Sequence, residues 1–368
     1  MSNEIKHHEK PIQIAKRDDM PMLKSWGVRA IGIVLALIVC SVVILLLTGY
    51  NPLQVYKAMF VGSFGSPRKV WYLLHNLSML LAISLAVTPA FKMKFWNIGA
   101  EGQTLVGGLA AAAMMIYFGN IIPGFILIPL MIIACMIAGM IWGIIPAYFK
   151  AKFNTNETLF TLMMNYVAMQ LISFFIVFWE NPKDSNHIGI INSNTMGGWL
   201  PSLFGQKYLL NIIIVAVITI GMYIYLKYSK HGYEISVVGE SENTARYIGI
   251  NVKKVILRTM ALSGALCGVA GFLLVAGTHH TVDTNTAGGL GFTAIMVSWL
   301  AKFNPIVMIL VSFLIAFLER GAGEIATACG LNQSIAEILT GIIIFFIIGS
   351  EFFVQYKVNF RKKHKEVA

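Results

Sequence analysis

The sequence predicts an all-α, polytopic membrane protein with about ten transmembrane helices, on the strength of composition, hydropathy and span length. Of its 368 residues, 57% are hydrophobic and only 12% are charged. The mean hydropathy is +0.71, so the chain has too few polar groups to cover a soluble globule of its size. Apolar runs recur at the length of about 20 residues that a hydrocarbon core requires. Lipid is therefore the expected solvent.

Ten apolar segments fit this template, although the eighth and ninth are short for a full crossing. The first is expected to stay in the protein, because mostly polar residues precede it and it lacks the small-residue pattern of a signal-peptidase site. The predicted spans are residues 27–49, 71–91, 103–118, 121–149, 159–179, 209–227, 255–277, 291–300, 306–318 and 335–353.

The basic residues predict the orientation of these spans. With the N-terminus inside, most of the 28 Lys and Arg fall in the two tails, in the turns after spans two, four and eight, and around a long polar segment. This is the asymmetry of the positive-inside rule. We therefore expect a multi-pass protein of the plasma membrane with both termini cytoplasmic, and the net charge of +11 indicates topology rather than nucleic-acid binding.

The predicted domain organisation follows from these spans. A cytoplasmic tail (1–26) precedes the transmembrane domain (27–356), and a basic cytoplasmic tail (357–368) follows it. The polar segment 228–254 is a cytoplasmic loop. Two external loops, 50–70 and 180–207, are rich in Gly, Pro, Asn and Ser, which suits either partner docking or simple connection.

No pattern for bond-breaking chemistry is present. The chain contains no GxxxxGK[ST] phosphate loop, no HExxH and no GxSxG, so it is not expected to be an enzyme or to bind a cofactor. The four cysteines show no CxxC spacing and are expected to serve packing. His279, His280 and Asp283 form a compact set on a loop expected to be exposed; adjacent histidines in such a place more often bind no metal, and none is predicted.

Polar residues among glycines at 95–103 are the most informative stretch. Asn97, Glu101 and Gln103 stand between two spans, where they could line or gate a path through the membrane, or form a helix-capping turn. Asn76 and Asn165 lie within spans and could bond a polar ligand or another helix.

A weak internal symmetry links the two halves. The Gly-rich start at 99–103 has a counterpart at 288–292, and Asn156-Glu-Thr before span five has one in Asn332-Gln-Ser before span ten. Five spans separate the members of each pair, which predicts inverted repeats with a substrate path at their interface. Glycines spaced by four, Gly139 with Gly143 and Gly264 with Gly268, predict close helix packing.

The segment 228–254 contains a second candidate element. Residues 241–247 are expected to form a short helix, with Ser241 as its cap and Gly249 just beyond its end. Such a helix could transmit motion from a soluble partner protein that supplies the energy, or it could be a plain connector.

Taken together, these motifs resemble the permease subunits of ABC-type simple-sugar and nucleoside importers, in the branched-chain/ribose-type superfamily and its branch that works with basic-membrane-protein lipoproteins. The resemblance runs from about residue 49 to 353. It includes Asn-Ile-Gly-Ala-Glu-Gly-Gln at 97–103, Leu-Met-Met-Asn-Tyr at 162–166, Ala-Arg-Tyr-Ile-Gly-Ile at 245–250 and the glycines of 288–291.

The resemblance implies a type II importer-like fold, with the loop around 234–249 as the element that seats in an ATPase. The residues matched to that role are Glu234, Gly239, Glu240, Ala245, Arg246 and Gly249. It also implies an ATP-binding subunit that carries the ATP and Mg²⁺, a second homologous permease and a substrate-binding lipoprotein. One departure is Glu-Asn-Thr at 242–244, where relatives tend to have Asn-Pro; it leaves the ATPase contact open.

The predicted function is therefore the translocation path of a bacterial ABC importer for nucleosides, related ribosides or simple sugars. The alternative is a secondary transporter driven by an ion gradient. Such proteins usually carry ionisable groups near the midplane, whereas Glu101, Glu157, Glu319, Glu337 and Glu351 all fall near predicted span ends.

Overall fold

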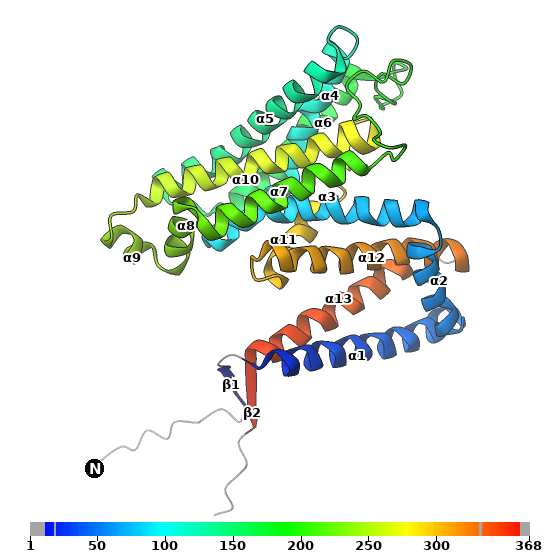
Figure 1. Cartoon of the computed structure of the whole chain (residues 1–368), viewed down its shortest axis with the longest axis vertical. Helices are drawn as coiled ribbons and strands as arrows, with labels where there is room; N and C mark the ends of the chain where they lie inside the picture. The colour runs from blue at the N-terminus through cyan, green and yellow to red at the C-terminus, as the bar shows by residue number, and fades with distance from the viewer. Residues whose placement is uncertain (1–11, 18–19, 331–332, 361–368) are drawn as a thin grey trace, which may run out of the picture. The chain divides into compact units, whose positions relative to one another are not determined.

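The computed structural model describes residues 12–17, 20–330 and 333–360, and these are almost entirely helical (Figure 1). They divide into two compact units, residues 1–65 with 318–368 and residues 66–317. The elements are β1 (Ile12–Lys16), α1 (Met22–Thr48), α2 (Pro52–Phe64), α3 (Pro67–Lys92), α4 (Ala100–Phe118), α5 (Gly124–Phe153), α6 (Glu157–Trp179), α7 (Leu209–Tyr228), α8 (Lys230–Glu240), α9 (Glu242–Tyr247), α10 (Val252–Leu274), the π-helix η1 (Val275–His279), α11 (Leu290–Leu300), α12 (Pro305–Cys329), α13 (Gln333–Gln355) and β2 (Tyr356–Phe360).

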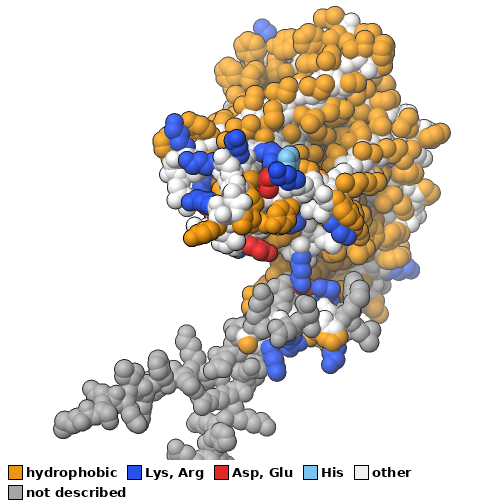
Figure 2. Space-filling view, turned by 60° about the vertical axis from the view of Figure 1, so that its left-hand side comes forward, with side chains coloured by type: hydrophobic (Ala, Val, Ile, Leu, Met, Phe, Trp, Pro, Cys, Tyr) orange, Lys and Arg blue, Asp and Glu red, His pale blue; other side chains and the backbone are white. Residues whose placement is uncertain are grey.

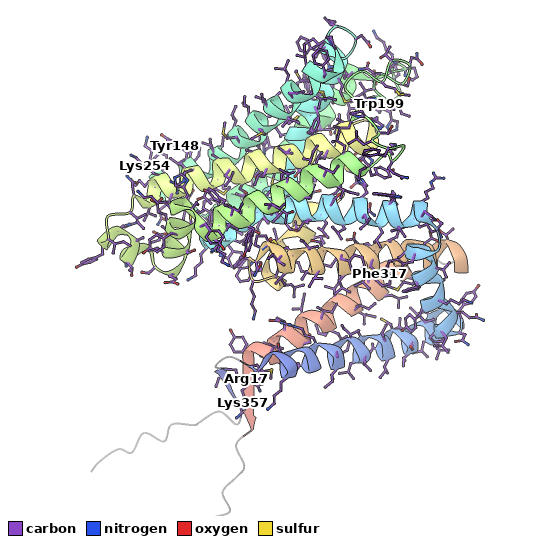
Figure 3. The ribbon with its side chains drawn as sticks, in the orientation of Figure 1. Arg17, Tyr148, Trp199, Lys254, Phe317 and Lys357 are labelled. Atoms are coloured by element: carbon purple, nitrogen blue, oxygen red, sulfur yellow. The ribbon has the colours of Figure 1, made fainter. Side chains whose placement is uncertain are left out.

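The first unit brings the two ends of the described chain together. Helices α1 and α13 pack against each other, and Arg29 bonds Glu351 at 2.9 Å. Strands β1 and β2 pair antiparallel, with Ala15 opposite Lys357; Figure 3 shows Arg17 beside Lys357. Strands β1 and β2 thus hold the segments before α1 and after α13 side by side.

The second unit is a layered bundle. Helices α4 and α10 pack at its centre and are buried along most of their length, as is the second half of α3. Helices α5, α6 and α7 bury only one narrow face and expose long apolar side chains elsewhere. Protein surrounds the inner helices, whereas the outer ones have the surface that lipid covers.

The glycine pairs act as predicted in the contact between α5 and α10. A Cβ on Gly139 would collide with the carbonyl of Gly264, and one on Gly268 would collide with the carbonyl of Cys135. The two backbones can approach this closely only because neither side has a side chain there. Cys40, Cys135 and Cys267 are buried free thiols.

Each predicted span coincides with a helix, but not all of these helices have the length and apolarity of a full crossing. In the described residues, seven do: Gly27–Leu47, Pro67–Lys92, Gly124–Phe153, Glu157–Trp179, Leu209–Tyr228, Val252–His279 and Pro305–Thr327. Helix α4, with Glu101, Gln103 and Thr104 in its first turns, is not among them although most of it is buried. Helix α11 has only 11 residues.

Three expectations need correction. The segment 50–70, predicted as an external loop, is mostly helical, because α2 occupies it and α3 begins at Pro67; Asn51 and Ser66 cap these helices and a proline follows each. The segment 228–254 holds α8 as well as the predicted short helix. Helix α12 continues past residue 318, which places Glu319 and Arg320 inside a helix rather than beyond its end.

Some expectations fall outside the described residues. These are Asn332 in the proposed counterpart of the α6 cap, residues 1–11 of the first tail and 361–368 of the last. In the first half, Asn156 does cap α6, since its side chain accepts hydrogen bonds from the amides of Thr158 and Leu159.

Candidate functional site

The turn between α3 and α4 places the predicted path residues. Helix α3 ends at Lys92, and Lys94 takes the left-handed conformation with a φ of 61°. The Phe95 amide then donates to the Ala90 carbonyl at 2.9 Å, which closes the turn. The Phe95 side chain is buried in an apolar cluster with residues of α8 and α10. The turn is thus a packed element at the end of the bundle beside α8.

Asn97 and Gln103 form a buried pair of amides. Asn97 Oδ1 accepts hydrogen bonds from the Gly99 amide and from Gln103 Nε2, both at 3.1 Å. Asn97 Nδ2 donates to Ser263 Oγ of α10 at 3.1 Å and to Gln103 Oε1 at 3.3 Å. Both side chains are buried. The pair begins α4 and ties it to α10.

Asn165 joins α6 to the same turn. Its Oδ1 accepts from the Gly102 amide and its Nδ2 donates to the Ile98 carbonyl, both at 2.9 Å. A Cβ on Gly102 would lie 2.8 Å from this Oδ1. The glycine is therefore required for the asparagine to reach the backbone on both sides of it.

Glu101 caps a helix other than its own. It lies in the first turn of α4, yet its carboxylate accepts from the Gly289 amide at 2.8 Å and from the Gly291 amide at 2.7 Å. These amides belong to the start of α11, where helices have unpaired N–H groups and the positive end of their dipole. Only 3% of Glu101 is exposed, so the charge is matched by a helix terminus instead of water.

Helix α11 is too short to cross a hydrocarbon core by itself. At 11 residues it is about 16 Å long, roughly half the hydrocarbon thickness. The irregular segment before it, residues 280–289, buries Val282 and Ala287 in the core. Irregular backbone inside a membrane protein persists only where protein or water satisfies it, and Glu101 satisfies the amide of Gly289. The short predicted span 291–300 is therefore a half-helix whose N-terminus lies inside the unit.

Four of the five predicted path residues meet in this network. Asn97, Glu101, Gln103 and Asn165 lie within two turns of the start of α4 or bond to it. Asn76 does not join them. It is half-buried on α3, 16 residues before Lys92 and so about 24 Å along the helix. Whether these residues contact substrate stays a prediction.

Four of the six predicted coupling residues anchor α8 and α9 to the bundle. Glu234 accepts from Arg258 of α10 at 2.8 Å, and a Cβ on Gly239 would collide with the Lys92 carbonyl at the end of α3. Ala245 has no exposed surface, and Gly249 turns the chain toward α10 with a φ of 84°. The predicted cap is confirmed, because Ser241 Oγ accepts from the Thr244 amide at 3.2 Å.

The other two coupling residues face outward. Glu240 is exposed, and Arg246 pairs with Glu242 at 3.2 Å on the surface of α9. Tyr247, which the sequence reasoning did not select, is 95% exposed. Figure 2 shows Lys and Arg side chains gathered on this face, which contrasts with the mostly hydrophobic surface around it. The sequence feature that could have identified Tyr247 is an aromatic side chain within the polar segment 228–254.

A second polar cluster lies at the far end of the same unit, where Figure 3 places Trp199 opposite Tyr148; the sequence analysis singled out His280 in it but not its partners. His280 stacks on Trp199 with ring centroids 3.7 Å apart. His75 Nε2 lies 3.1 Å from Thr278 Oγ1, and Asn211 is buried against Gly277. The loop with His280 was expected to be exposed, but only 6% of this residue is exposed. Gly277 and Thr278 lie in the π-helix η1 and His280 follows it, and no sequence pattern predicts a π-helix.

Comparisons with known proteins agree with this architecture. A family model described as "Branched-chain amino acid transport system / permease component" matches residues 70–348. The guanosine ABC transporter permease protein NupP of Bacillus subtilis is 31% identical over 87% of this chain and 92% of its own length. The nucleoside ABC transporter permease protein NupB of Lactococcus lactis is 29% identical over 83% and 86%. The glucose ABC transporter permease protein TsgB13 of Haloferax volcanii is 28% identical over 95% and 93%.

Helices of a membrane-spanning length, a short helix that begins against a buried carboxylate and a family match over most of the chain all indicate the same class. This protein is a multi-pass membrane permease rather than an enzyme, and an ATP-binding subunit and other transporter components work with it. The chain belongs to the branched-chain amino acid transport system permease family of ABC transporters.

Proposed function

We propose that this permease imports nucleosides or related ribosides. The observation that carries the proposal is the bond from Glu101 to the start of α11. In transporters with broken helices, the positive N-terminus of a half-helix commonly receives an anionic group of the substrate. Here a protein carboxylate already occupies it, which favours a neutral cargo over the carboxylate of an amino acid.

The relatives agree with a neutral cargo, since two of the three are named for guanosine or nucleoside transport. A simple sugar is the second candidate, because TsgB13 is named for glucose and aligns with most of this chain. Both substrate classes lack a carboxylate. The buried amides of Asn97, Gln103 and Asn165 could hold the turn at which such a path opens.

We also propose that α8 and α9 seat in the ATP-binding subunit on the cytoplasmic side, and that both termini lie on that side. Motion of α9 would pass through α8 to α10 by the Glu234–Arg258 bond and to the end of α3 by the contact at Gly239. The turn after α3 then leads to Glu101 and α11. ATP and Mg²⁺ belong to the partner, and a second permease and a substrate-binding lipoprotein complete the importer.

Uptake by the reconstituted complex tests this proposal. Proteoliposomes with ATP inside should accumulate labelled guanosine or uridine, and substrate-loaded binding protein should increase ATP hydrolysis. Accumulation of glucose alone would select the second candidate. Uptake that stops when the ion gradient is collapsed while ATP stays high would contradict ATP-driven import.

A further inference from the structure

Two outer helices of the bundle end in the same six-residue pattern. Helix α5 ends with Tyr-Phe-Lys-Ala-Lys-Phe at 148–153, and α7 ends with Tyr-Ile-Tyr-Leu-Lys-Tyr at 223–228. In each case a tyrosine is followed four residues later by a lysine and five residues later by another aromatic residue. Spacing of four places the tyrosine and the lysine on one helix face.

The geometry of the two patterns is also the same. Lys152 Nζ donates to Tyr148 Oη and Lys227 Nζ donates to Tyr223 Oη, each at 3.0 Å. Each ammonium also lies near two rings: Lys152 is 5.4 Å from the Tyr148 ring and 5.3 Å from that of Phe153. Lys227 is 5.3 Å from the Tyr223 ring and 5.4 Å from that of Tyr228.

The surroundings of these lysines differ from those of their neighbour Lys150. Lys150 forms a salt bridge with Glu157 at 2.9 Å, whereas Lys152 and Lys227 contact aromatic side chains. Both motifs end outer helices whose exposed side chains are apolar, and Phe153 and Tyr228 are themselves 58% and 68% exposed. Each charge is thus held at the boundary between a lipid-facing helix surface and the polar end of the bundle.

We propose that each Tyr–Lys–aromatic motif binds the phosphate of an anionic phospholipid headgroup. An ammonium has three N–H donors and one of them goes to the tyrosine oxygen, which leaves the phenol O–H to donate outward to the same phosphate. The flanking rings hold the lysine in place and contact the upper acyl chains. A lipid fits better than a free anion because the apolar helix face continues directly from the motif.

Lipid selection by the full chain in nanodiscs tests the proposal. The discs contain phosphatidylcholine with phosphatidylglycerol, and native mass spectrometry measures which lipids stay bound. A lysine near an anionic headgroup should favour phosphatidylglycerol by about fivefold per site. Lys152→Gln with Lys227→Gln should abolish that enrichment. Tyr148→Phe with Tyr223→Phe should reduce it, since the rings remain and only the hydroxyls are lost.

The matched control is Lys230→Gln with Lys253→Gln. It removes the same charge from two exposed lysines near the same end of the bundle, and neither has a ring contact among the described residues. Enrichment that falls equally in the control would show general surface attraction and overturn the proposal. Full enrichment in the Lys152/Lys227 variant would overturn it too, as would displacement of bound phosphatidylglycerol by millimolar inorganic phosphate.

Discussion

Replacement of Glu101 by Gln removes half of the cap on α11. The carboxylate accepts one amide on each oxygen, at 2.8 and 2.7 Å. A glutamine can accept on Oε1, but its Nε2 is a donor and would face an amide N–H. One buried amide loses its partner, the other bond loses its charge, and the favourable interaction with the helix dipole is lost. We expect a loss of about 2–4 kcal/mol in local stability.

Hydrogen–deuterium exchange measures this loss where it occurs. A local destabilisation of about 2–4 kcal/mol corresponds to amide exchange at Gly289 and Gly291 that is about 30- to 1,000-fold faster. Glu157→Gln is the control, because it removes an equal charge from a partly exposed pair with Lys150 and should change stability by less than about 1 kcal/mol. Wild-type protection of both amides in Glu101→Gln would refute the reasoning.

Three further predictions concern packing, coupling and pH. Gly268→Ala would drive a Cβ into a carbonyl of α5, so the thermal midpoint should fall by the equivalent of about 1–3 kcal/mol; Gly221→Ala, with open space around it, should leave it unchanged. Tyr247→Ala removes a side chain that is 95% exposed, so the free energy of unfolding should change by less than about 0.5 kcal/mol. The ATP hydrolysis that loaded binding protein stimulates should nevertheless fall. Normal stimulation in this variant would exclude Tyr247 from the ATPase contact. Burial lowers the pKa of His280 to about 4, with Lys207 and His279 adding to the effect. In the unfolded chain the pKa of this histidine is near 6.5, so it costs no stability above that pH and destabilises the fold progressively as the pH falls toward 4. The variant His280→Phe keeps a ring against Trp199 and should lose less thermal stability on acidification than the wild type. Equal losses in the two proteins would contradict this role of His280.

The positions of the helices could be predicted from the sequence, because the length of an apolar run is a local property of the chain. The ten predicted spans each coincide with a helix, and Ser241 and Asn156 cap helices where their side chains predicted it. The same signal does not report what surrounds a helix. The sequence predicts α4 as a span like its neighbours, but it does not show that α5, α6 and α10 pack against it.

The contacts of the site depend on tertiary packing, which no local pattern encodes. The sequence placed Asn97, Glu101 and Gln103 together because they are close in the chain, but Asn165 and Ser263 reach them from distant helices. The helix α2 was missed because its glycines and polar residues favoured a loop, whereas Asn51 and the following proline start a helix.

Glu101 also bears on the predicted symmetry between the halves. The sequence paired the glycine-rich start of α4 with that of α11, and the structure joins these two starts directly through the Glu101 carboxylate. In the described network, the amides of Asn97 and Asn165 satisfy the start of α4 from its own half, whereas the start of α11 depends on a residue of the other half. A rearrangement that separates the halves at this point must therefore expose a buried carboxylate and two amides together. Water or a polar substrate would then have to satisfy all three.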